Sequence, residues 1–242
     1  MSKLLDKVRA VLRTRHYSYR TEKTYIEWIL HYIRFHGIRH PAEMGAVEIE
    51  AFLSHLAVEK TVSASTQNQA LSALLFLYRE VLGVNLPWLE KFTPAKKASR
   101  VPIVLTKEEV KLIINQLSGT NWLIANLLYG AGLRLHEALR LRVKDVDFGF
   151  RQIVVRDGKG AKDRFTVLPK KLVEPLQKQL ESARQLHDQD LRRGLGNVEM
   201  PFALARKYPN GEWEWAWQFV FPSKNLSVNP RTGAKGRHHV SP

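Results

Sequence analysis

The segment LLYGAGLRLHEAL, residues 127–139, carries the pattern that decides the fold and the chemistry of this chain. Arg134 follows two closely spaced glycines, and Glu137 lies about one helical turn after it. A second segment, GKGAKDR at residues 158–164, presents Lys159 between two glycines. An arginine can hold two phosphate oxygens in a planar fork, and a lysine can protonate a leaving alkoxide. The two segments together indicate half of a phosphodiester-cleaving site.

The local setting of Arg134 adds to this interpretation. It is expected at a helix start, where free backbone amides attract anions, with Glu137 placed to orient a neighbouring base. Each segment alone is weak, because a lone helical arginine is most often a surface residue and a Gly-Lys-Gly turn is often only a turn.

Competing motifs fail on spacing. A zincin helix would need a second histidine where Arg140 stands, and a dinucleotide fingerprint would need a third glycine where Leu135 stands. A phosphate-cradling loop ending at Lys159 would need a glycine where Ile153 stands. Metal and nucleotide sites are therefore disfavoured, and no cofactor is expected.

Composition points to a globular protein with a polyanionic partner. The 242 residues are 44% hydrophobic, contain no cysteine and carry a formal charge of +15. Basic side chains outnumber acidic ones 15 to 9 in residues 1–100 and 23 to 14 in residues 101–242. Charge alone leaves open a basic protein without a specific partner. Neither a signal peptide nor a membrane-spanning run is visible, so we expect a soluble cytoplasmic protein with no membrane partner.

The first 86 residues read as an all-α domain. Apolar residues recur at helical spacing, and Ser63-Ala64-Ser65-Thr66 is a good N-cap cluster for a fourth helix that Gly83 closes. The other face of that helix carries Gln67 and Asn68, whose side chains can contact bases or phosphates, although a merely solvated face is about equally plausible. Residues 87–102 hold three prolines and an excess of bases, including Lys96, Lys97 and Arg100, which predicts a basic linker running along a DNA backbone.

Residues 103–242 read as an α+β domain. Thr106 and Glu109 predict a capping box for a helix through about Leu117, and residues 122–129 form an apolar and therefore buried helix. A turn at 130–132 leads to a helix through Leu141, and residues 145–148 read as a turn. Residues 152–155 and 164–168 read as strands of a hairpin around Lys159, and a polar helix follows Pro169 through about His187.

These residues resemble the tyrosine recombinases of the phage integrase family. Gly132-Leu133-Arg134 with Glu137 is similar to their first catalytic box, and Lys159, 25 residues after Arg134, is similar to their hairpin lysine. The resemblance implies a mainly α fold with an all-α, SAM-like core-binding domain and an incomplete α+β catalytic domain. It also implies that Arg134 clamps the scissile phosphate, that Lys159 is the general acid and that Glu137 supports the site.

A further resemblance concerns residues 190–222. The run ALARKYP at 203–209, followed by Trp213, Trp215 and Trp217, resembles the insertion of integron integrases. This implies cassette recombination and a grip on folded single-stranded hairpin sites by receiving protruding bases. Tryptophans at spacing two would lie on one face of a strand, where Trp215 and Trp217 could stack on bases while at least one tryptophan packs a core.

Other basic residues complete the expected DNA-binding set. Lys162 and Arg164 follow the hairpin lysine, and the tail contains Arg237, His238 and His239 without an acidic residue after Lys224. A metal site at the two histidines is disfavoured because further ligands are missing nearby. DNA contact is the expected role, at double-stranded attachment sites as well as hairpin sites. In the full-length family this occurs within a tetramer.

The resemblance covers only the front part of the family's length. No second box of the form His-x-x-Arg and no late tyrosine nucleophile follow the tail histidines. We expect a shortened chain that binds DNA but does not cleave it alone, with an exposed apolar face on the second domain. The alternatives are a DNA strand-exchange enzyme recorded in part and a non-catalytic DNA-binding protein that occupies recombination sites.

Overall fold

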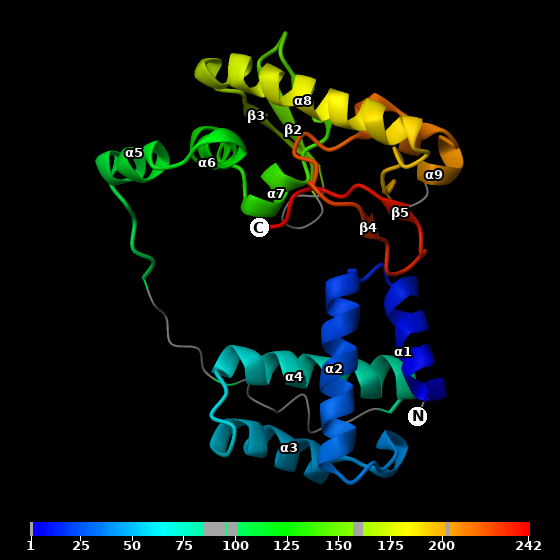
Figure 1. Ribbon diagram of the computed structural model, residues 1–242. Coiled ribbons are helices and arrows are strands. Elements are labelled where there is room, and N and C mark those ends of the chain that lie inside the picture. Colours follow the sequence, from blue (N-terminus) through cyan, green and yellow to red (C-terminus); the bar gives the residue numbers. More distant parts are fainter. Residues whose placement is uncertain (1, 85–94, 96–100, 157–161, 202–203) are drawn as a thin grey trace. The chain divides into compact units, whose positions relative to one another are not determined.

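The computed structural model describes residues 2–84, 95, 101–156, 162–201 and 204–242, and its ribbon is drawn in Figure 1. The chain divides into two compact units, residues 1–102 and 103–242. The mainly α architecture with small antiparallel sheets confirms the predicted fold class. Across the described ranges, no helix is long and apolar enough to cross a membrane.

The described residues of the first unit form helices and connecting turns, without a strand. Their bounds are α1 Ser2–Thr14, α2 Tyr19–Phe35, the 3-10 turn η1 Pro41–Glu43, α3 Ala46–Val58, α4 Ala64–Phe76 and the π-helical extension η2 Leu77–Leu82. Ser63 caps α4 by accepting a hydrogen bond from the Thr66 amide at 3.2 Å, as predicted. Gly83 ends the helix in the left-handed conformation at φ 69°.

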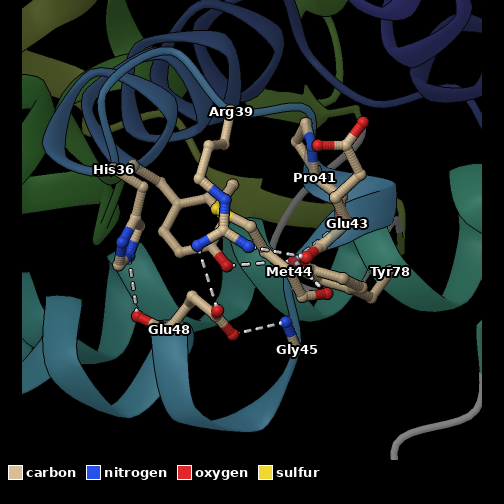
Figure 2. Close-up of polar contacts among 9 residues, drawn as sticks. His36, Arg39, Pro41, Glu43, Met44, Gly45, Glu48 and Tyr78 are labelled. Atoms are coloured by element: carbon tan, nitrogen blue, oxygen red, sulfur yellow. Dashed lines mark hydrogen bonds and ion pairs between the residues drawn. The ribbon is translucent and has the colours of Figure 1, made fainter.

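A buried polar contact lies inside the apolar core of this unit. The hydroxyls of Tyr32 and Tyr78 are 2.9 Å apart, and the Tyr78 hydroxyl also lies 3.0 Å from the Pro41 carbonyl oxygen. Burial is the main reason why the pKa of each tyrosine is raised. Figure 2 shows the adjoining corner, where the Glu48 carboxylate accepts from Gly45 N at 2.8 Å and from Arg39. These bonds fix the turn between α2 and α3.

The second unit combines helices with a three-stranded sheet. Its elements through the sheet are α5 Lys107–Asn115, α6 Gly119–Ala131, α7 Leu135–Leu139, η4 Val143–Asp145, β1 Val146–Asp147, β2 Gln152–Val155 and β3 Arg164–Val167. The sheet is antiparallel in the order β1-β2-β3, with Val155 opposite Arg164. Helix α8, Val173–Arg192, follows the 3-10 turn η5, Lys170–Leu172, and its Leu176 shares a core with Ile153 and Leu127.

Several boundaries in this unit differ from the predictions. Helix α6 continues through Gly130 to Ala131, so the chain turns only at Gly132, which is left-handed at φ 64°. Helix α7 stops at Leu139 instead of reaching Leu141, and part of the expected turn at 145–148 is strand β1. Tyr129 is 55% exposed, so the helix predicted to be buried has one solvent-facing side.

The segment after α8 contains short helices and no strand among its tryptophans. Its elements are α9 Leu204–Lys207, η6 Gly211–Trp213, η7 Trp215–Trp217, β4 Ser227–Val228 and β5 Lys235–Gly236. The prediction of a tryptophan-bearing strand was wrong: the carbonyls of Gly211 and Trp215 accept from amides three residues on, which winds the backbone into 3-10 turns. The side chains of Val198, Met200, Trp217 and Phe219 pack together as a small core within this segment.

Apolar side chains are also exposed on the second unit. Helix α5 has no buried residue, and Leu112 is 65% exposed. On β3, the outward-facing Phe165 and Val167 are 68% and 59% exposed.

Candidate phosphate-binding site

Arg134 is positioned by the turn that joins α6 to α7. The left-handed Gly132 ends α6, Leu133 is buried in the core, and Arg134 is the N-cap residue of α7. Its side chain remains 57% exposed. Because the preceding leucine anchors the turn, the guanidinium is held at the surface by a fixed backbone.

Glu137 organises the site from behind. Its side chain is 9% exposed and accepts from the Arg134 amide and Nη1, both at 2.8 Å. Arg164, at the start of β3, donates to the same carboxylate through Nη2 at 2.6 Å and Nη1 at 2.9 Å. These bonds, led by those from Arg164, lower the pKa of Glu137 to about 2 despite its burial. Glu137 is therefore a carboxylate at any physiological pH, and it fixes two guanidinium groups side by side.

An open hollow lies in front of the two arginines. It is lined by Gly132, Arg134, Lys162, Asp163 and Arg164. Its three cationic side chains, Arg134, Lys162 and Arg164, are accompanied by two carboxylates. Asp163 lines the hollow and lies 3.6 Å from Arg156, and Glu137 binds both arginines from behind. The net positive field and the exposed Arg134 fork suit a phosphate group.

The structure corrects one expectation at this site and adds a role for Arg164. The Arg134 amide is not free to bind an anion, since the Glu137 carboxylate already accepts from it. The guanidinium of Arg164 is held on Glu137 by two hydrogen bonds, and its expected contact with DNA stays a prediction. Its more direct role is to neutralise and orient Glu137.

Some predicted residues fall outside the described part of the chain. These are Lys159, Lys96, Lys97 and Arg100. The strands β2 and β3 nevertheless pair as predicted on either side of Lys159, with Arg156 and Lys162 as the nearest described residues.

The side-chain amides of Gln67 and Asn68 form hydrogen bonds within the first unit. Asn68 forms two bonds with the backbone of Ala95, donating to its oxygen at 3.0 Å and accepting from its nitrogen at 2.9 Å. Gln67 donates to the Leu53 oxygen at 3.1 Å. Both amides thus stabilise contacts within the first unit, and DNA contact by Gln67 and Asn68 stays a prediction.

The tryptophans after α8 have different environments. Trp217 is only 9% exposed, and the Lys144 ammonium lies 2.8 Å from its ring centre, so its assignment to base contact is corrected to a core role. Burial is the main cause that lowers the pKa of Lys144 to about 8. Trp215 is half-buried, with the Arg184 guanidinium 5.3 Å from its ring centre, and Trp213 is 36% exposed. Trp213 and Trp215 thus retain ring surface that a base could reach.

The three tail residues also differ from one another. Arg237 binds buried Asp190 through Nε at 2.5 Å and Nη2 at 2.9 Å, so its expected DNA contact is corrected to an internal ion pair. His238 and His239 lie with ring centres 5.2 and 5.4 Å from that of Phe219. Burial lowers the pKa of both histidines, to about 4 for His239. Both are therefore neutral near pH 7.

Arg142, which the sequence analysis did not select, joins the chain after α7 to the segment between α8 and β4. Arg142 donates to the Trp217 oxygen at 2.6 Å and to the Glu199 oxygen at 2.8 Å, and its guanidinium lies 4.7 Å from the Phe219 ring centre. No local pattern marks Arg142, because its partners are 57 and 75 residues away. Within the described ranges, no group of three or more histidine, aspartate or glutamate side chains is placed to hold a metal ion.

Both units of the chain match models of known protein families. The model of the phage integrase N-terminal SAM-like domain matches residues 4–88, and the phage integrase family model matches residues 103–237. The chain belongs to the phage integrase family of tyrosine recombinases. An integrase/recombinase from Escherichia coli is 48% identical over 238 residues, which cover 98% of this chain and 71% of that protein. The tyrosine recombinase XerA of Thermococcus kodakarensis is 36% identical over 166 residues, covering 67% and 56% of the two chains.

Two solved integrase structures share the fold. A lambda integrase dimer bound to a COC′ core site has a TM-score of 0.54 at 21% identity, covering 76% of this chain and 68% of that one. The Tn1549 transposon integrase in complex with circular intermediate DNA has a TM-score of 0.55 at 16% identity, covering 92% and 71%. At these identities the likeness describes the fold alone.

Proposed function

We propose that this recombinase chain binds DNA with a backbone phosphate in the hollow at Arg134. The observation that carries the proposal is the exposed Arg134 fork, held in place by a carboxylate that Arg164 keeps ionised. A guanidinium whose orientation is fixed before binding loses little freedom on contact with two phosphate oxygens. The formal charge of +15 favours approach to any nucleic acid.

In this proposal the clamp serves transesterification of a DNA phosphodiester. Arg134 takes the non-bridging oxygens and offsets the charge that develops on them, Glu137 and Arg164 hold it, and Lys159 protonates the leaving 5′ oxygen. The reaction also needs a nucleophile and a second phosphate ligand. We assign neither to the tyrosines or arginines within residues 1–242, so these residues alone are expected to bind without cutting.

The substrate that we propose is a gene-cassette site, either double-stranded or folded from a single strand into a hairpin with unpaired bases. The exposed ring surfaces of Trp213 and Trp215 support this, since aromatic faces stack on bases of any identity. His238, which is exposed, and His239, which is half-buried, add neutral hydrogen-bonding groups beside Phe219. Assembly on such a site would follow the tetramer expected from the family.

A non-catalytic role is the alternative, in which the chain occupies recombination sites and blocks them. The two roles differ in whether the coding frame continues beyond Pro242. A frame that runs through a His-x-x-Arg box and a late tyrosine supports the enzyme, and a stop codon supports the blocking protein.

The test is a binding and trapping experiment with the 242-residue chain. We expect a hairpin with unpaired bases to bind more tightly than a fully paired duplex of the same length, and affinity to fall steeply with salt. A nicked suicide substrate should yield no covalent protein-DNA adduct. Equal affinity for any DNA would refute the cassette-site proposal, and an adduct would show that a nucleophile lies within these residues.

A further inference from the structure

A buried ion pair joins the end of helix α8 to the tail that follows strand β5. Asp190, near the end of α8, and Arg237, beyond β5, have side chains that are 3% and 10% exposed. Two N–H groups of Arg237 donate to Asp190, and Nη1 donates to the carbonyl oxygens of Ser223 at 2.7 Å and Lys224 at 2.8 Å. All three guanidinium nitrogens of Arg237 are thus engaged within the protein.

The residues after Arg237 are placed by the same contact. The Ser223 amide donates to the His238 oxygen at 2.7 Å, and the Val240 amide donates to the Phe221 oxygen at 2.8 Å. The backbone at His239 forms an antiparallel bridge with Pro222. This short tail segment, residues 237–240, therefore lies along residues 219–223 with its two imidazole rings against Phe219.

Strand β5 passes very close to the backbone of Asn197 at Gly236. A Cβ atom added there would lie 2.7 Å from the backbone oxygen of Asn197. A side chain at position 236 would force backbone to move, so the approach of β5 to residue 197 depends on glycine. The ion pair at Arg237 and the close approach at Gly236 are thus two separate contacts that fix the position of residues 236–240.

We propose that Asp190 and Arg237 are a positioning pair that fixes His238 and His239 where the unpaired base of a DNA hairpin is recognised. This inference rests on the proposed function. The alternative is a direct phosphate contact by Arg237, which would require it to give up Asp190. That exchange would leave a carboxylate buried without its partner, which is costly.

The experiment compares variants of the full chain on two hairpins that differ only in one unpaired base. Asp190→Asn and Arg237→Ala should each reduce the discrimination between the hairpins by about tenfold, and the double variant by no more than either alone. Gly236→Ala should reduce it without any change of charge. Arg193→Ala, an exposed residue near Asp190, is the control that loses one positive charge and should keep the discrimination.

Salt dependence distinguishes positioning from direct contact. If Arg237 only positions, Arg237→Ala leaves the slope of log affinity against log salt unchanged. A slope reduced by about 0.9 for Arg237→Ala, but not for Asp190→Asn, would overturn the proposal in favour of one lost phosphate contact. Full discrimination in both Asp190→Asn and Gly236→Ala would also overturn it.

Amide exchange in the absence of DNA separates this inference from the proposed function. Asp190→Asn should speed exchange of the Ser223 and Val240 amides, while the Ala138 amide in α7 keeps its wild-type rate. If wild type shows no preference for the unpaired base, the proposed function fails, while faster exchange in the variant still supports the positioning pair. Unchanged exchange at Ser223 and Val240 would refute the positioning pair itself.

Discussion

Replacing Glu137 with glutamine should destabilise the second unit in a strongly pH-dependent way. The ionised carboxylate accepts from Arg134 and Arg164, and its pKa lies at about 2 instead of the ordinary 4.5. A difference of this size corresponds to about 3 kcal/mol of unfolding free energy. Arg134 and Arg164 are partly exposed and can be solvated again, so the loss should not exceed this value.

The sign of the pH dependence follows from the lowered pKa. Above pH 4.5 the carboxylate is charged in both folded and unfolded chains, and its full contribution is present. As the pH falls from 4.5 to 2, the unfolded chain takes up a proton first, and the contribution is lost. The gap in unfolding free energy between wild type and Glu137→Gln should therefore be at most about 3 kcal/mol at pH 7 and close to zero at pH 2.

The assay is urea unfolding followed by tryptophan fluorescence at several pH values. Glu174→Gln is the matched control, because Glu174 pairs with Lys178 in the same unit but is 76% exposed and screened by solvent. The control should unfold at nearly the wild-type urea concentration at every pH. A gap for Glu137→Gln that equals that of the control, or that stays constant from pH 7 to pH 2, would refute the reasoning.

Three further predictions concern other parts of the molecule. Lowering the pH from 6.5 to 4 should release the tail, since burial disfavours protonated His239. The protection factor of the Val240 amide, which is its exchange rate corrected for the intrinsic effect of pH, should therefore fall in wild type and change less in His239→Asn; an equal change in both would contradict this. Tyr78→Phe should lower the unfolding free energy of the first unit by about 1–3 kcal/mol in urea titrations, because buried carbonyls lose a donor, and an unchanged value would contradict this. Trp217→Ala should lower the free energy of unfolding by about 3–5 kcal/mol in thermal or urea unfolding, because Trp217 packs in the core. Trp215→Ala should leave this free energy nearly unchanged and weaken binding of a hairpin with an unpaired base. The reverse order of the two effects would refute the assignment of core and surface roles.

Features that depend on local sequence could be predicted. Ser63 and Thr106 cap their helices because a hydroxyl reaches an amide three residues away, which is a contact that the sequence spacing defines. The pairing of β2 with β3 follows from two short β-prone runs around a glycine-rich turn. Arg134 and Glu137 could be linked for the same reason, since they are neighbours on one helical turn.

Features that depend on distant partners could not be predicted. The basic character of Arg164 and Arg237 suggested DNA contact, but each meets a buried carboxylate 27 or 47 residues away. The alternating tryptophans suggested a strand, yet the backbone winds into 3-10 turns and buries Trp217 beside Lys144. Composition reveals that a charge or ring is present, and only the tertiary contacts determine whether DNA can reach it.

The role of Arg134 as the phosphate clamp is tested most directly by the salt dependence of hairpin binding in wild type and Arg134→Ala. A phosphate held by Arg134 predicts that the variant binds more weakly and that its slope of log affinity against log salt is smaller by about 0.9. Arg192→Ala, which removes an exposed charge at the end of α8, should keep the wild-type slope. Equal slopes for wild type and Arg134→Ala would contradict the assignment of Arg134 as the phosphate clamp.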